Sequence, residues 1–151
     1  MRIETDDLSR PQVIALLNEH LSNMHELSPP ESVHALDVGK LRSANISFWT
    51  VWDQDALLGC GALMQLSAIH GEVKSMRTPQ AMRRKGAGRM VLAHIIGVAR
   101  ERGYRHLSLE TGTGDAFVPA QKLYSSFGFS VCGPFGSYVE DPYSLFMSLQ
   151  F

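Results

Sequence analysis

A short basic, glycine-containing stretch is the first part of the chain whose residue types suggest a binding site. Residues 83–88 read Arg-Arg-Lys-Gly-Ala-Gly, and apolar residues at helical three- and four-residue spacing follow directly. Small residues at a helix start leave the free N–H groups of the first turn accessible. Those donors, the helix dipole and the neighbouring cations attract anions. The stretch therefore predicts a phosphate or pyrophosphate site, with a tight turn as the alternative.

Two common phosphate-binding loops do not match this stretch. The dinucleotide fingerprint GxGxxG would need a further glycine three residues after Gly88, where Val91 stands. The P-loop would need Ser or Thr after a Gly-Lys pair, and no such sequence follows.

A second motif, Leu-Tyr-Ser-Ser-Phe-Gly-Phe at residues 123–129, gives the first one its context. A strand, an Arg-x-x-Gly-x-Gly helix, a strand and a helix ending in Leu-Tyr-x-x-x-Gly-Phe resemble the GNAT-family N-acetyltransferases over roughly residues 45–150. The resemblance implies an α/β fold whose central mixed, mostly antiparallel β-sheet is flanked by helices. It also implies a splayed parallel pair of strands at the cofactor site, and acetyl-CoA as the cofactor.

The resemblance also assigns residues to the cofactor. Main-chain groups of Met76, Arg77 and Thr78 would pair with the pantetheine arm as an added strand. The pyrophosphate would lie on the loop and the helix start, whose residues are Arg83, Arg84, Lys85, Gly86, Ala87, Gly88 and Arg89.

Transfer of an acetyl group from a thioester to an amine requires two proton transfers. Tyr124 occupies the position of the family's tyrosine that protonates the departing thiolate, although a buried core tyrosine is the alternative. The amine must lose a proton before it attacks, because an ordinary amine is protonated at neutral pH. Glu72 is the first candidate base and His70 the second, since both share one face of a strand. Glu72 could instead pair with Lys74.

One position departs from the family pattern. Members often carry an asparagine two helical turns before the tyrosine, and Phe117 stands there in this chain. That asparagine commonly bonds the pantetheine arm, so Phe117 removes one expected contact.

The acceptor is expected to enter between residues 25–34 and 133–142, which carry histidines, Tyr138 and several carboxylates. The carboxylates favour a cationic amine, whereas Arg77 would favour an acceptor that also carries a carboxylate. The sequence leaves this choice open.

The expected elements form an alternating α/β pattern without repeats or linkers, and we expect one domain over residues 1–151. Ser28 and Glu31 form a candidate capping box for a second helix, and Asp115 is a candidate cap for a later one. The predicted strands cover residues 2–5, 46–66 as a hairpin, 71–77, 106–110, 129–132 and 144–149, and the predicted helices 11–24, about 29–41, 87–102 and 116–127.

Composition narrows the function classes. The chain has 44% hydrophobic and 19% charged residues and a net charge of −1, without the basic excess of nucleic-acid or membrane-surface proteins. Cys60 and Cys132 lie in apolar runs and are expected to be buried free thiols, and no metal site is expected. No signal peptide or membrane span is recognised, so a cytoplasmic protein is expected. A homodimer is possible, because dimers are common in the family.

Two functions fit these observations. The first is an N-acetyltransferase acting on a primary amine of a small molecule, amino acid, peptide or protein by direct attack in a ternary complex. The alternative is a catalytically idle acetyl-CoA-sensing domain that regulates a protein partner.

Overall fold

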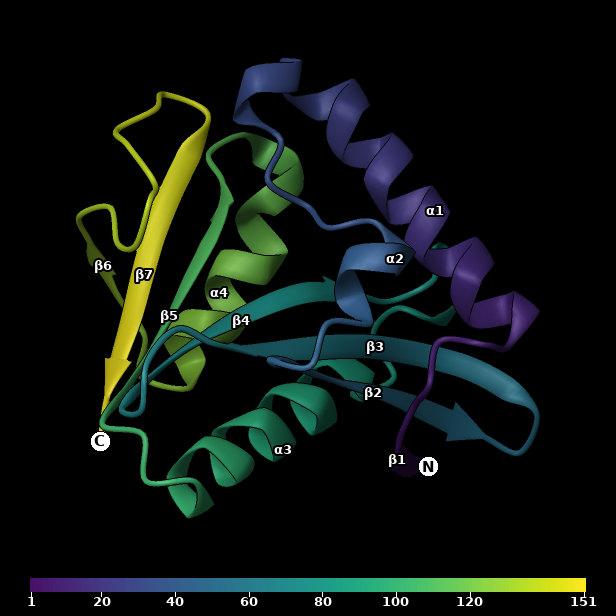
Figure 1. Cartoon of the computed structure of the whole chain (residues 1–151). Coiled ribbons are helices and arrows are strands. Elements are labelled where there is room, and N and C mark those ends of the chain that lie inside the picture. Colours follow the sequence, from purple (N-terminus) through teal and green to yellow (C-terminus); the bar gives the residue numbers. More distant parts are fainter.

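A seven-stranded mixed sheet forms the centre of the molecule, which a computed structural model describes over residues 1–151 (Figure 1). The strand order is β1-β2-β3-β4-β5-β7-β6, and every neighbouring pair is antiparallel except β4 and β5. The strands are β1 (Arg2–Thr5), β2 (Ile46–Asp53), β3 (Ala56–Gln65), β4 (His70–Arg77), β5 (His106–Gly112), β6 (Ser130–Cys132) and β7 (Ser144–Gln150). The mixed, mostly antiparallel sheet is the one predicted.

Helices cover both faces of this sheet (Figure 1). The four α-helices are α1 (Pro11–Leu27), α2 (Val38–Leu41), α3 (Ala87–Glu101) and α4 (Val118–Ser126). Val91 and Ile95 of α3 are fully buried in a 17-residue apolar cluster that also contains Tyr124 of α4. Val13 of α1 and Leu41 of α2 belong to a second cluster on the opposite face. None of the helices has both the length and the apolar character needed to cross a membrane.

The parallel strands β4 and β5 separate soon after they begin. They are paired only at His70↔His106, Gly71↔Leu107 and Glu72↔Ser108, and beyond this point Figure 1 shows them diverging. The edge of β4 that faces β5 therefore carries unpaired main-chain groups after Glu72. This is the splayed parallel pair that the resemblance implied.

A bulge lies in the same part of β4. Ala62 pairs with Lys74 but Cys60 pairs with Arg77, so β4 has one extra residue between these pairs. Ser75 lies in this interval with a left-handed φ of 54°, which is costly for a residue other than glycine. A bulge changes which way the following side chains point, so it sets the direction of Met76 and Arg77.

Two predicted helix caps are wrong. Ser28 is extended at the end of α1, and Pro30–Ser32 forms only a 3₁₀ turn without a side-chain cap. The second helix, α2, starts later and is capped by Asp37, which accepts a hydrogen bond of 2.8 Å from the Lys40 amide. Asp115 likewise lies inside a 3₁₀ turn and caps nothing.

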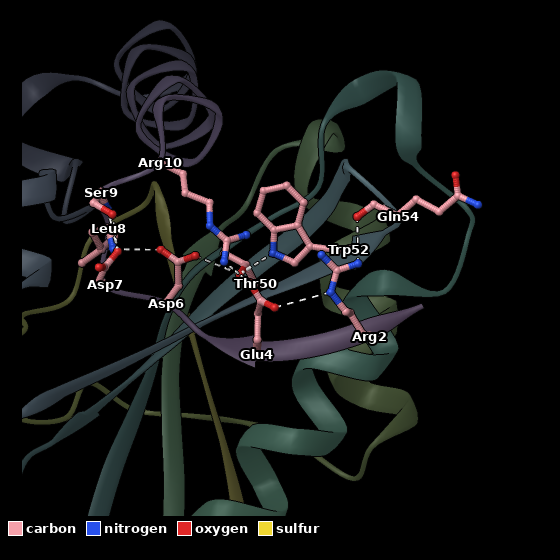
Figure 2. A network of polar contacts seen from close by, with 10 residues as sticks. All are labelled: Arg2, Glu4, Asp6, Asp7, Leu8, Ser9, Arg10, Thr50, Trp52 and Gln54. Atoms are coloured by element: carbon pink, nitrogen blue, oxygen red, sulfur yellow. Dashed lines mark hydrogen bonds and ion pairs between the residues drawn. The ribbon is translucent and has the colours of Figure 1, made fainter.

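A polar network attaches the N-terminal strand and the start of α1 to β2 (Figure 2). Asp6 accepts hydrogen bonds from the Leu8 amide (2.8 Å) and from Oγ1 of Thr50 (3.1 Å). The guanidinium of Arg10 forms an ion pair with Glu4 and lies 4.5 Å from the ring centre of Trp52. These contacts fix the entry of α1, which forms one wall of the site described below.

Candidate active site

A cleft of about 1280 Å³ opens where β4 and β5 diverge. One side is formed by β4 and by the loop that leads to α3, and the other by the end of β5 and by α4. Residues of α1 and of the segment after it form the third wall. The cleft thus joins the predicted cofactor residues and the predicted acceptor side in one continuous space.

The loop before α3 has the backbone geometry of an anion site. Gly86 is the N-cap of α3 with φ 85°, and Arg84 has φ 65°. Left-handed residues next to right-handed ones turn successive N–H groups toward one point, and strain of this kind is common at binding sites. Because Gly86 lacks a β-carbon and β4 has an open edge, a phosphate-bearing pantetheine chain fits this part of the cleft.

Most of the predicted cofactor residues line the cleft. They are Met76, Arg77, Thr78, Arg83, Arg84, Gly86, Gly88 and Arg89. The side chains of Lys85 and Ala87 do not line it. Lys85 is exposed beside Met82, and Ala87 is buried in the core against β3. These two residues can contribute main-chain N–H groups only.

Arg77 is directed toward α1 instead of lying free in the cleft. Its guanidinium donates 3.0 Å hydrogen bonds to Oε1 of Glu19 and to Oδ1 of Asn23. Its positive charge is therefore compensated, which weakens the expectation that Arg77 selects an acceptor carboxylate. The neighbouring His20 is uncharged at neutral pH, because burial, and then the charge of Arg77, lowers its pKa to about 4.

Glu72 belongs to a closed hydrogen-bonded cluster. Its Oε2 accepts bonds from Nζ of Lys74 (3.0 Å) and from the hydroxyl of Tyr138 (2.6 Å). Lys74 also donates to the Tyr138 oxygen at 3.1 Å. Both members of the ion pair are buried, with side chains 3% and 8% exposed. The sequence left open whether Glu72 pairs with Lys74, and the structure contains this ion pair.

Tyr124, the predicted proton donor, lines the cleft and keeps its hydroxyl proton. The residue lines the cleft from α4 and is 7% exposed. Burial, and then the charge of Glu110, raises its pKa, so the hydroxyl keeps its proton at neutral pH.

His70 lies outside the cleft. Its Nε2 is 2.7 Å from Oγ of Ser108, and its ring centre lies 3.8 Å from that of His106. Strand alternation places His70 on the face of Glu72, but His70 precedes the point where β4 and β5 separate. Its predicted role as a base is therefore not supported by its position.

Sequence reasoning missed Glu110 as a titrating group. It lines the cleft near the end of β5, and burial is the main reason why its pKa is raised to about 7. The sequence did show Glu110 near the end of a short apolar strand, β5, which pairs with the strand that carries Glu72.

Phe117 and the acceptor segments lie partly as expected. The Phe117 ring lines the cleft and packs against Gly112 of β5, so the missing asparagine is replaced by apolar contact. The segment of residues 25–34 contributes lining residues, but none of residues 133–142 lines the cleft. Those residues reach the site indirectly, through Tyr138 and through Asp141, which accepts a 2.6 Å hydrogen bond from Ser32.

Comparison with known proteins agrees with this geometry. The family model of the acetyltransferase (GNAT) family matches residues 12–129. The chain belongs to the GNAT family. It is 55% identical to YsnE of Bacillus subtilis, an uncharacterized N-acetyltransferase, over 98% of both chains. It is 50% identical to the uncharacterized N-acetyltransferase YedL of Escherichia coli, over 97% of this chain and 92% of that protein. An IAA acetyltransferase of Azospirillum brasilense is 38% identical over 89% of this chain and 88% of its own length.

Solved structures share the fold. A Bacillus subtilis acetyltransferase in complex with CoA superposes with a TM-score of 0.67 at 17% identity, covering 99% of this chain and 98% of that one. A GNAT acetyltransferase of Elizabethkingia anophelis with acetyl-CoA bound gives a TM-score of 0.69 at 14% identity, covering 99% and 97%. These structures show the shared fold, and the family match with the N-acetyltransferase relatives makes the chain an acetyl-CoA-dependent N-acetyltransferase, as predicted.

Proposed function

We propose that this acetyltransferase transfers the acetyl group directly to a cationic primary amine, with Tyr124 protonating the departing thiolate. The observation that carries the proposal is the position of Tyr124. Tyr124, buried near the end of α4 and protonated at neutral pH, lines the side of the cleft across from β4. A thiolate leaving at this point needs a proton donor, and Tyr124 is the tyrosine that α4 contributes to the cleft, whereas Tyr143 comes from the loop before β7.

The chemistry of the cysteines supports direct transfer. Cys60 is 1% exposed, and burial raises the pKa of its thiol to about 12, so the nucleophilic thiolate is not formed at neutral pH. Cys132 is on β6 and does not line the cleft. Without a cysteine nucleophile, the amine itself attacks the thioester in a ternary complex.

The charge of the acceptor side supports a cationic amine. Beyond the basic loop, the cleft is lined by five carboxylates and two cations, which leaves a net charge of −3. They are Glu19, Glu26, Glu72, Glu110, Asp115, Lys74 and Arg77. Both cations are already paired, so an incoming ammonium group is attracted by the remaining carboxylates.

The amine must also lose a proton. Glu72, the base predicted from the sequence, lines the cleft and stays a candidate for this role. Its Oε2 already accepts two hydrogen bonds, so it could act only through its other oxygen or through water.

The test is release of free thiol from acetyl-CoA in the presence of a panel of primary amines and amino acids. IAA, which has no primary amine, is tested separately, because the Azospirillum relative is named for it. We expect cationic amines without a carboxylate to accelerate thiol release most. If no compound accelerates release above the hydrolytic background, the proposed reaction is wrong and the idle sensor becomes the better description. A homodimer stays a prediction, which light scattering of the purified chain tests.

A further inference from the structure

Glu110 is the one carboxylate of the cleft that is partly buried and forms no ion pair, because Glu26 and Asp115, the other unpaired ones, are exposed. It follows the last β4–β5 pair, Glu72↔Ser108, and so lies where the two strands have already diverged. Its side chain lines the cleft, is half-buried and makes no ion pair. Tyr124 lies close enough for the charge of Glu110 to raise its pKa. An ionisable carboxylate and a hydroxyl donor therefore share the same part of the cleft.

Glu72 is less suited to accept a proton. Protonation would remove the charge that compensates the buried ammonium of Lys74 and would weaken the bond from Tyr138. Leaving one member of a buried ion pair without its partner is strongly destabilising. Glu110 belongs to no ion pair, so protonation of its carboxylate leaves no buried cation without a partner.

We propose that Glu110, and not Glu72, takes the proton from the acceptor amine, while Glu72 positions Lys74 and Tyr138. This proposal rests on the proposed function above. It places the base on β5, whereas the sequence favoured Glu72 of β4.

The surroundings of Glu110 suit a base that works near neutral pH. Burial is the main cause that raises its pKa to about 7, and the charge of Lys74 opposes this. A base with a pKa close to the working pH is ionised often enough to act and still binds a proton firmly. The titratable groups that act on it are Glu72 and Lys74 from β4, Tyr124 from α4, and Tyr138 and Asp141 from the segment before β7.

The ammonium of the acceptor gives one proton to Glu110, which later releases it to solvent. The neutral amine attacks the thioester carbon, so that a C–N bond forms and the C–S bond breaks. The Tyr124 hydroxyl gives its proton to the departing thiolate, and the second proton of the amine replaces it on Tyr124. The products are the amide, free CoA thiol and one proton.

The test compares two probe amines of similar size, ethylamine and 2,2,2-trifluoroethylamine. The first is protonated at pH 7 and needs a base, whereas the second is mostly neutral and does not. We expect Glu110→Gln to lower kcat/KM for ethylamine by about 100-fold. The same variant should retain most of the rate with trifluoroethylamine. Glu101→Gln, an exposed carboxylate at the end of α3, serves as the matched control and should match wild type with both amines.

The competing assignment is tested in parallel. Glu72→Gln should lower the rates with both amines alike and lower the Tm. If Glu72→Gln instead loses only the ethylamine reaction while Glu110→Gln keeps it, the proposal is overturned. If Glu110→Gln no longer binds acetyl-CoA, the variant Glu110→Asp is measured instead. It should shift the pH at which kcat/KM falls on the acidic side. If that pH does not change, the proposal is overturned. A wild-type chain that is inactive with both probes and the whole amine panel overturns the proposed function as well.

Discussion

The Tyr138 hydroxyl donates a 2.6 Å hydrogen bond to Oε2 of Glu72, although 66 residues separate them in the sequence. This bond connects the loop before β7 to the strand that lines the cleft. Glu72 also carries the charge that balances Lys74. The loop is therefore held to β4 by a hydrogen bond to a carboxylate that also forms a buried ion pair within β4.

Lys74→Met should destabilise the protein by about 3–5 kcal/mol, because it leaves the buried Glu72 carboxylate without its cation. The double variant Glu72→Leu/Lys74→Met should be less destabilised than the sum of its two single variants. Urea unfolding of the four proteins at pH 7 measures this coupling. Additive effects would mean that the two side chains do not stabilise each other.

Tyr124→Phe should lower kcat by about 100-fold, because it removes the proton donor for the thiolate. Its affinity for acetyl-CoA should change little. Tyr104→Phe is the matched control: the Tyr104 hydroxyl is buried without a hydrogen-bond partner, so its removal should leave activity unchanged and stability equal or higher. Steady-state kinetics and calorimetric binding separate the two effects, and an active Tyr124→Phe enzyme would refute the assigned role.

Arg84→Ala should weaken acetyl-CoA binding, and the loss should be largest at low salt, because charge attraction to phosphate is screened by ions. A loss of roughly five- to tenfold corresponds to one charge-assisted contact of about 1–1.5 kcal/mol. Arg100→Ala, at the opposite end of α3, removes an equal charge far from the loop. Titration calorimetry at two salt concentrations provides the measurement. Equal losses for both variants would indicate only a general effect of net charge.

Glu110 should lower stability as pH rises from 4.5 to 7, while His20, whose pKa is lowered to about 4 mainly by burial, should raise it over much of the same range. Its pKa is 4.5 in an ordinary environment and about 7 in the folded chain, chiefly because of burial. Between these values the folded chain keeps a proton that the unfolded chain has released, so rising pH favours unfolding by about 3 kcal/mol at most. This contribution is complete below pH 4.5 and lost above pH 7. Glu110→Gln should remove it, whereas Glu101→Gln should keep the wild-type slope in chemical unfolding across this range.

Gly61→Ala should destabilise the protein by about 1–3 kcal/mol, because the core has no room for the added carbon. A β-carbon at Gly61 would collide with Val91 of α3 and would lie 2.7 Å from Sδ of Met76. Gly97→Ala should instead stabilise the protein. A β-carbon at Gly97 would have no atom within 4 Å, and alanine is more favourable than glycine in a helix interior by about 1 kcal/mol. Thermal unfolding should therefore show opposite shifts in Tm, and shifts of the same sign would contradict the packing described for α3.

Local patterns in the sequence determined much of this structure. The helical spacing of apolar residues and the glycine that follows defined α3, and alternating strands with a short turn defined the hairpin of β2 and β3. The motif around Tyr124 and the basic loop before α3 indicated the family, and their order along the chain also placed the cofactor side of the cleft. These features depend on neighbours within a few residues, which is why the sequence alone could reveal them.

Contacts between distant residues decided the rest. The αL conformation of Ser75 depends on how β4 meets β3, and no local signal marks it. Whether Glu72 was free or paired depended on Tyr138, a residue from another part of the chain. The raised pKa of Glu110 arises from burial, which exists only after β5, α4 and the loop before β7 have packed together. Residue types supply chemical groups, but their charge states depend on which groups the folded chain brings around them.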